Sequence, residues 1–253
     1  MYPLIDTHAH LSEIQDLANA IAGAKSAGIT AIIAVGSESE SNQRVLALAE
    51  EYKGFVYPAL GLHPWGLGTL DIDHNLEFIQ AHINQAVAIG EIGLDYDKRV
   101  RARADKALQM QALREVLRLA QTHNKPALVH SRYAWRDCLD IVAAANIEKV
   151  VFHWYTGTSG VLRDIVSHGF FISATPAVEY HDEHRRAVRE VPLERLLLET
   201  DSPVVYRRGT PSEYQSTPAH IVRALQAVSR LRGMPESGIA AITTDNARRL
   251  FGL

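Results

Sequence analysis

The sequence of 253 residues lacks several features that would assign it to a special class of protein. Its single cysteine, Cys138, excludes an internal disulfide framework and is typical of a reducing compartment. The chain contains no apolar run near the roughly 20 residues that a transmembrane helix requires. The N-terminal stretch MYPLIDTHAH has neither the basic start nor the apolar length of a signal peptide. We therefore expect a cytoplasmic protein with no membrane association.

An excess of charge of one sign is also missing. The chain has 26 Lys and Arg against 29 Asp and Glu, which gives a net charge of −3 and excludes a global basic field for nucleic acid. Linkers, low-complexity segments and short internal repeats are absent, so residues 1–253 are expected to form one domain. Histidine is frequent by contrast: several of the 12 histidines stand at the ends of apolar runs, where packing does not need an imidazole.

Eight short apolar runs, each followed by an amphipathic segment, indicate the fold. Strands are expected at 4–10, 31–36, 56–63, 87–95, 127–132, 149–154, 169–176 and 195–203. Helices are expected at 13–27, 39–52, 73–86, 103–124, 135–146, 158–168, 180–190 and 217–233, with one or two short helices in 236–252. This alternation predicts an α/β protein with a distorted (β/α)8 TIM barrel.

An open, doubly wound sheet is the alternative fold. Such a sheet usually has a glycine-rich phosphate turn after its first strand, where this chain has HAHLSE. The segment 203–216 is long for a barrel connection, which makes it a candidate for function.

The first apolar run, LIDTHAHL, carries His8 and His10. Residues i and i+2 of a strand project from one face, so both imidazoles are presented to the same side. This spacing suits two ligands of one cation, and it equally suits a pair of hydrogen-bonded core histidines.

Residues of ligand type recur at the carboxyl ends of other runs, on the face of a barrel where catalytic residues gather. These residues are His63, Glu91, His130, His153 and Asp201. A satisfied buried polar group could explain any one of them, but not their recurrence at equivalent strand positions.

Glu91 is central to the expected site because glycines flank it and leave room for a ligand. One carboxylate among histidines can bridge two cations about 3.5–4 Å apart, the geometry of a two-metal hydrolytic site. The expected ligands of one cation are His8, His10 and Asp201, and those of the other are His130 and His153.

The sequence resembles the TatD family of metal-dependent hydrolases, from the amidohydrolase-like superfamily of barrels. The resemblance rests on the ordered motifs IDTHAHL (5–11), GLHPW (61–65), GEIGLDY (90–96), VHSR (129–132), FHWYTG (152–157) and LLLETDSP (196–203). It implies a phosphodiester hydrolase, commonly a deoxyribonuclease acting from 3′ ends, with DNA or another phosphodiester as substrate. The metal ligands that it implies are His8, His10, Glu91, His130, His153 and Asp201.

The chain departs from the family pattern in loops that are expected to face the substrate. The departures are Tyr133, Trp154, Asp97 and Ser216-Thr217. They bear on the identity of the substrate rather than on hydrolysis.

Catalytic roles are expected for Asp201, Glu91 and His63. Two divalent cations per subunit (Mg, Mn or Zn) would generate hydroxide near neutral pH and neutralise charge on the phosphate. Asp201 would orient the water and take its proton. His63 would contact a phosphate or protonate the leaving oxygen, or else be structural at the barrel rim.

Further residues are expected to support the site. Glu199 either orients a ligand or is a core carboxylate paired with Lys or Arg, and Asp95 holds a loop or a histidine. The expected substrate contacts are Arg132, Trp65, Tyr155 and Arg208.

Two other functions stay open at this point. A hydrolase of the same superfamily could act on a carboxyl ester, lactone, amide or aminoacyl-tRNA ester. A protein of another class would bind metal without catalysis. No obligate protein partner is expected.

Overall fold

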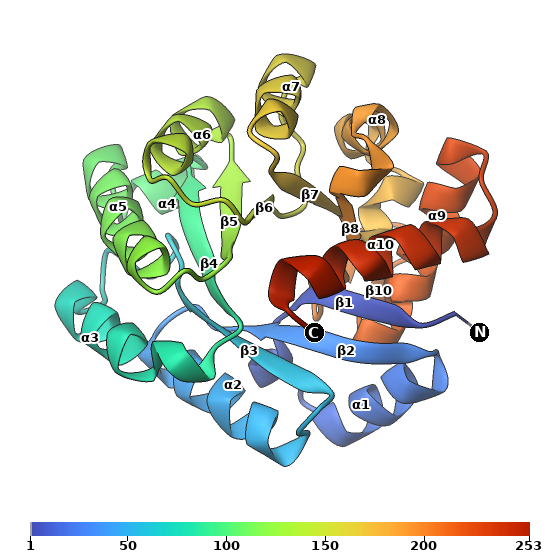
Figure 1. Ribbon diagram of the computed structural model, residues 1–253, viewed down its shortest axis with the longest axis horizontal. Coiled ribbons are helices and arrows are strands. Elements are labelled where there is room, and N and C mark those ends of the chain that lie inside the picture. The colour runs from blue at the N-terminus through green and yellow to red at the C-terminus, as the bar shows by residue number, and fades with distance from the viewer. Residues whose placement is uncertain (1) are drawn as a thin grey trace.

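A computed structural model describes residues 2–253. Within this range eight parallel strands pair in chain order, and helices surround them (Figure 1). The strands are β1 Leu4–Ala9, β2 Ile29–Val35, β3 Val56–Leu62, β4 Ala88–Asp95, β5 Ala127–Arg132, β6 Val150–Phe152, β7 Phe171–Ala174 and β8 Leu196–Leu198. A single parallel bridge between Ala9 and Ser202 joins β1 to the segment after β8. The predicted TIM barrel is confirmed.

The outer layer consists of helices and short 3-10 turns. The helices are α1 Leu17–Ser26, α2 Ser39–Glu51, α3 Ile72–His82, α4 Lys98–Arg101, α5 Lys106–Thr122, α6 Trp135–Ala144, α7 Ser159–Ser167, α8 Asp182–Glu190, α9 Ile221–Arg232 and α10 Glu236–Phe251. The turns are η1 Leu11–Glu13, η2 Ile83–Gln85, η3 Pro176–Glu179, η4 Leu193–Arg195 and η5 Pro218–His220. Across residues 2–253, the helices are all too short or too polar to span a membrane.

Two segments follow β8 in the C-terminal third. Within the long connection 203–216, β9 Val205–Tyr206 and β10 Tyr214–Gln215 pair as an antiparallel hairpin. The tail forms the single helix α10, which lies across the barrel beside β1 (Figure 1). Leu250 and Phe251 of α10 pack against Ile5, Ala31 and the other apolar residues inside the barrel near the starts of the strands.

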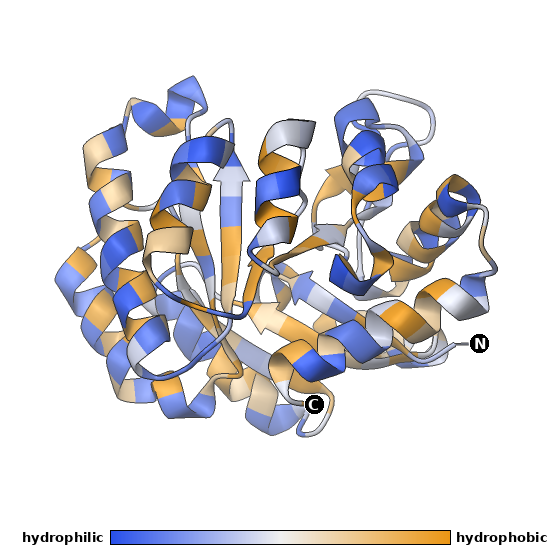
Figure 2. Ribbon diagram, turned by 45° about the horizontal axis from the view of Figure 1, so that its top comes forward, coloured by the Kyte–Doolittle hydropathy of each residue, from blue (hydrophilic) through white to orange (hydrophobic). Residues whose placement is uncertain are grey.

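Alternation along each strand separates two apolar layers. Ala31, Ile33 and Val35 of β2 face the barrel interior, whereas Ile32 and Ala34 face the helices. The helices are hydrophobic where they meet the strands and hydrophilic on their outer faces (Figure 2).

The same alternation carries the ligand residues into the barrel mouth. His130 follows the inward Leu128 by two residues, and His153 follows the inward Val151 by two. Continuing an inward row beyond the apolar layer therefore places a polar side chain over the centre of the barrel.

Glu91 reaches the interior through an irregularity in β4. Ile89 and Ile92 both pack toward the helices although they are three positions apart, where strict alternation would place them on opposite faces. The register with β3 and β5 shifts between these two residues, as in a β-bulge. The neighbouring strand accommodates the bulge through Gly61, where a Cβ atom would overlap the backbone of Glu91.

Candidate metal centre

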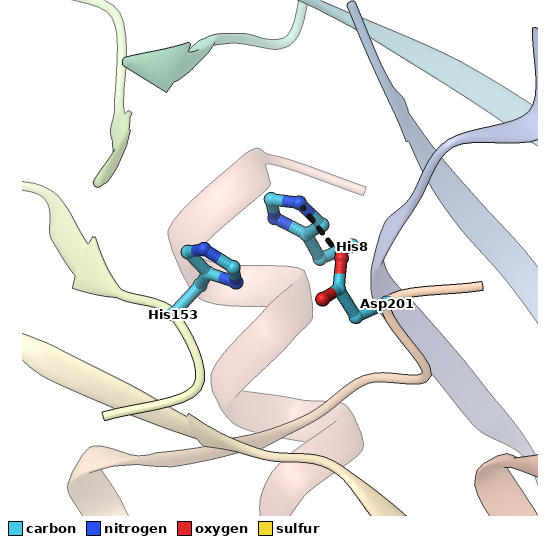
Figure 3. Close-up of side chains that lie close together, drawn as sticks. All are labelled: His8, His153 and Asp201. Carbon is cyan, nitrogen blue, oxygen red and sulfur yellow. Dashed lines mark ion pairs between the residues drawn. The ribbon is translucent and has the colours of Figure 1, made fainter. Parts of the chain in front are cut away.

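The carboxyl ends of the strands surround a cavity of about 880 Å³. Its lining includes the predicted residues His10, His63, Glu91, His130, His153 and Asp201. His8 is buried beside them. Figure 3 shows His8, His153 and Asp201 pointing toward one another from three separate segments of the chain. The structure therefore brings the predicted ligand residues together at one end of the barrel.

Glu91 lies at the centre of this cluster, and its two oxygens face different histidines. Oε2 lies 3.3 Å from His8 Nε2 and 3.2 Å from His10 Nε2. Oε1 lies 2.8 Å from His130 Nδ1 and 2.7 Å from His153 Nε2. The Nε2 atom of His63 also lies 3.2 Å from Oε1. The two carboxylate oxygens are thus directed at different sets of imidazoles, as a bridging ligand requires.

Asp201 adds a second carboxylate on the side of His8 and His10. Its Oδ1 lies 3.6 Å from His8 Nε2 and 3.4 Å from His10 Nε2. Ligand atoms bound at about 2.1 Å to one cation are roughly 3–3.4 Å apart, so these separations match those of a metal site. Groups of ligand atoms mutually within 4.8 Å are His8–His10–Glu91, His8–His153–Asp201 and His63–Glu91–His130.

Buried negative charge makes this place attractive for cations. Burial raises the pKa of Glu91, but electrostatic attraction to the surrounding histidines outweighs burial and holds the pKa well below its usual range. Burial lowers the pKa of His10, but the hydrogen bonds to Asp201 and Glu91 outweigh burial and raise this pKa to about 10. The buried carboxylates therefore favour protonated imidazoles beside them. Divalent cations would supply the same positive charge while the imidazoles stay neutral and act as ligands.

His8 provides a further indication that the residues fit a metal. Both of its ring nitrogens are buried and have no hydrogen-bond partner among residues 2–253. Nε2 is close to Glu91 Oε2 but not in hydrogen-bonding geometry. Because an unsatisfied buried nitrogen costs free energy, this arrangement suits a metal ligand better than a core histidine.

Two histidines of the cluster are backed by a second carboxylate. His130 directs Nδ1 to Glu91 and Nε2 to Asp95 Oδ2 at 3.3 Å. His153 directs Nε2 to Glu91, and its Nδ1 lies 3.5 Å from Glu199 Oε1, close to the carboxylate but outside hydrogen-bonding geometry. Metal-binding histidines commonly donate their other N–H to such a carboxylate, which fixes the ring and its tautomer.

Asp95 and Glu199 also hold backbone and loop groups. Asp95 accepts hydrogen bonds from Trp65 Nε1 at 2.6 Å and from the Asp97 amide at 2.8 Å. Burial opposes its charge, but hydrogen bonds led by that of His130 lower the pKa of Asp95 to about 2. Glu199 Oε1 accepts the amide of Trp154 at 3.0 Å. Of the two alternatives for Glu199, its contacts favour the orientation of a ligand.

His63 has the hydrogen bonds of a donor rather than of a ligand. Its Nδ1 accepts the amide of Trp65 at 3.2 Å, which places the proton of the neutral ring on Nε2. Nε2 lies 3.2 Å from Glu91 Oε1. Burial lowers the pKa of His63 more than the charge of Glu91 raises it, so the ring is neutral at pH 7.

The predicted substrate contacts divide into two groups. Trp65, Arg132 and Arg208 line the cavity. Tyr155 does not: it is 1% exposed, packs in the core and donates its hydroxyl proton to the Thr158 carbonyl. The adjacent Trp154 lines the cavity, so Trp154, and not Tyr155, is the aromatic residue that faces it.

Sequence reasoning missed Asp6, Ser37 and His181. Ser37 and His181 line the cavity. Ser37 directly follows an expected strand, so its position at a strand end was a usable signal, whereas His181 follows the η3 turn and gave none. Asp6, two residues before His8, accepts hydrogen bonds from Thr200, which closely precedes Asp201.

Comparison with known proteins gives matches along the whole chain. The family model described as TatD related DNase matches residues 5–252. The uncharacterized metal-dependent hydrolase YabD of Bacillus subtilis is 34% identical, over 98% of this chain and 98% of its own. The 3′-5′ ssDNA/RNA exonuclease TatD of Erwinia tasmaniensis is 31% identical, over 99% of this chain and 100% of its own. The crystal structure of YjjV, a TatD homologue from Escherichia coli K12, has a TM-score of 0.89 and 30% identity and covers 99% of this chain and 98% of that one.

Proposed function

Because the chain belongs to the TatD family of DNases and metal-dependent hydrolases, we propose that it cleaves phosphodiester bonds at the 3′ ends of single-stranded nucleic acid. The relative from Erwinia tasmaniensis is named for 3′-5′ exonuclease activity on single-stranded DNA and RNA. The proposal extends that activity to this chain on the strength of its cavity.

The observation that carries the proposal is the division of Glu91 between two sets of imidazoles. We propose that one divalent cation is held by Glu91 Oε2, His8, His10 and Asp201, and a second by Glu91 Oε1, His130 and His153. Mixed nitrogen and oxygen ligands suit Zn or Mn, and phosphate oxygens of a substrate also allow Mg. Cations bound there would supply Lewis acidity and a nucleophilic water at neutral pH.

The remaining chemistry falls to residues of the cavity. Asp201 takes the proton of the attacking water. Burial raises the pKa of Asp201, but the hydrogen bond to His10 outweighs burial, and the lowered pKa keeps this carboxylate ionised. His63, neutral and protonated on Nε2, donates a hydrogen bond to a non-bridging phosphate oxygen or to the leaving oxygen.

Two arginines provide positive charge for the phosphate chain. Arg132 and Arg208 both line the cavity, the first as the last residue of β5 and the second in the β9–β10 hairpin. They offer local positive charge in a chain whose net charge is −3.

We also propose a cytoplasmic location. It is supported by the single cysteine, Cys138, which is buried and free.

The test of the function is a substrate panel with purified protein, stripped of metal by chelation and reloaded with Mg, Mn or Zn. The substrates are a 5′-labelled single-stranded DNA, its RNA equivalent, the corresponding duplex and a carboxyl ester. We expect metal-dependent loss of single nucleotides from the 3′ end of the single strands. Hydrolysis of the carboxyl ester alone would favour the superfamily alternative, and no hydrolysis with any metal would favour a non-catalytic metal-binding protein.

A further inference from the structure

The wall of the cavity between β3 and β5 carries two aromatic side chains that are exposed to solvent. Trp65, after β3, is 56% exposed, and Tyr133, after β5, is 58% exposed. Both line the cavity that contains Glu91. Large aromatic side chains are usually buried, so two exposed rings beside a catalytic cavity call for a ligand.

Trp65 is exposed but fixed in position. Its indole Nε1 donates to Asp95 Oδ2 at 2.6 Å. Its ring meets that of His63 edge to face at a centroid distance of 5.1 Å. A ring held by a buried carboxylate loses little conformational freedom when a ligand stacks on it.

Tyr133 is held at the same wall by its backbone and its neighbours. Its φ of 56° is left-handed, an uncommon conformation for a residue with a bulky side chain. The Arg132 guanidinium lies 5.4 Å from the Tyr133 ring centroid, and the Trp135 ring lies 6.0 Å away. Strained backbone of this kind clusters at active sites and ligand-binding positions.

Asp95 and Arg132 connect the two aromatic positions. The Asp95 oxygen that accepts the hydrogen bond of Trp65 lies 4.0 Å from Arg132 Nη1. Arg132 also pairs with Asp97 at 3.3 Å. The Arg132 guanidinium therefore lies beside the Tyr133 ring and near the Asp95 carboxylate that holds Trp65. This wall of the cavity combines a positive charge for a phosphate with two flat aromatic surfaces.

We propose that Trp65 and Tyr133 form a base-stacking subsite for the unpaired nucleobases next to the scissile phosphodiester. This inference rests on the proposed function and adds the part of the substrate that is recognised. Every nucleobase presents a π-face, so stacking is tolerant of sequence and does not separate DNA from RNA. Bases paired within a duplex cannot stack on these rings, and the substrate must therefore be single-stranded or frayed at its 3′ end.

The test compares Trp65→Ala and Tyr133→Asn with the wild type on three substrates. Asparagine is chosen at 133 because it tolerates a left-handed φ and removes only the ring. The substrates are a single-stranded oligonucleotide, the same oligonucleotide with abasic sites at its last two positions, and methyl p-nitrophenyl phosphate, a phosphodiester without a base. Tyr2→Ala serves as the matched control, since Tyr2 is an exposed tyrosine before β1, away from the cavity.

On the normal oligonucleotide, kcat/KM of Trp65→Ala and of Tyr133→Asn should fall by about tenfold or more, mainly because KM rises. This fall should exceed the fall of the same variant on methyl p-nitrophenyl phosphate by that factor. The wild type should lose a similar factor on the abasic oligonucleotide, and the variants should lose little more there. Tyr133→Phe, which keeps the ring, should restore the wild-type KM.

Equal losses by a variant on the normal and the abasic oligonucleotide would contradict stacking while leaving phosphodiester hydrolysis intact. Absence of hydrolysis of all three substrates by the metal-loaded wild type would overturn the proposed function and the subsite together.

Discussion

Asp6, in β1, and Thr200, just after β8, are joined by two hydrogen bonds across the seam of the barrel. Asp6 Oδ1 accepts the Thr200 amide at 2.9 Å, and Oδ2 accepts the Thr200 hydroxyl at 2.5 Å. In the described chain, backbone pairing at this seam includes the bridge between Ala9 and Ser202 and hydrogen bonds from His10 N to Ser202 O at 2.8 Å and from Asp201 N to His8 O at 2.9 Å. The Asp6 carboxyl therefore ties together the two segments that carry His8 and Asp201.

Replacing Asp6 by alanine should destabilise the protein and the metal centre together. The buried donors of Thr200 would lose their acceptor, which we expect to lower the free energy of unfolding by about 3 kcal/mol. Asparagine keeps one oxygen that can accept the Thr200 amide, so Asp6→Asn should cost less than Asp6→Ala, about 1 kcal/mol. Urea unfolding and metal titration of both variants would check this, and equal losses for Asn and Ala would refute the role of the hydrogen bonds.

The free energy of unfolding should decrease as the pH falls from the ordinary pKa of histidine, 6.5, toward the pKa of His184 in the folded chain, about 4. This buried ring donates from Nδ1 to the Tyr155 carbonyl and accepts the Thr175 amide at Nε2, which fixes the neutral tautomer. Burial lowers the pKa of His184 from 6.5 to about 4. Below pH 6.5 the unfolded chain therefore binds a proton that the folded chain does not, and the free energy of unfolding falls until the pH reaches about 4.

The effect of His184 can be isolated with His184→Gln, which does not titrate. Between pH 7.5 and pH 5, the wild type should lose about 2 kcal/mol more than the variant in urea unfolding. Parallel losses in the two proteins would show that His184 is not responsible for the pH dependence.

Asp201 and His63 should respond differently to substitution. Asp201→Asn keeps the shape but removes the basic oxygen, so kcat should fall by about 10²–10⁴ at saturating metal. His63→Ala removes a hydrogen-bond donor and should give a smaller loss, with a larger share in KM. Steady-state kinetics on a single-stranded oligonucleotide decides the point: near wild-type kcat in Asp201→Asn would exclude it as the base and direct the search to Glu91 or His63.

Much of the barrel and the ligand set could be predicted because both follow from short-range rules. Apolar runs of strand length specify the eight strands, and the i, i+2 spacing of His8 and His10 places both rings on the same side. The rule that strand ends converge at one face then brings His130, His153 and Asp201 together.

The rest depends on features that break these rules. The register shift in β4, which turns Glu91 inward, leaves no trace in hydrophobic alternation. Trp154, after the end of β6, has a left-handed φ of 39°, and Tyr155 is buried in the core rather than facing the substrate as expected. The hydrogen bonds of Asp6 and His184 join residues far apart or on different elements, so the sequence could not reveal them.

The central claim is that Glu91 holds two divalent cations that the reaction requires, and the number of bound ions tests it most directly. Metal-free protein would be titrated with Mn, with bound metal and release of 3′ nucleotides measured in the same samples and folding followed by far-UV circular dichroism. We predict two ions per chain, activity that appears only as both sites fill, and an unchanged fold after chelation because the barrel core is apolar. Full activity after chelation, or binding of fewer than two ions at saturating Mn, would contradict the account.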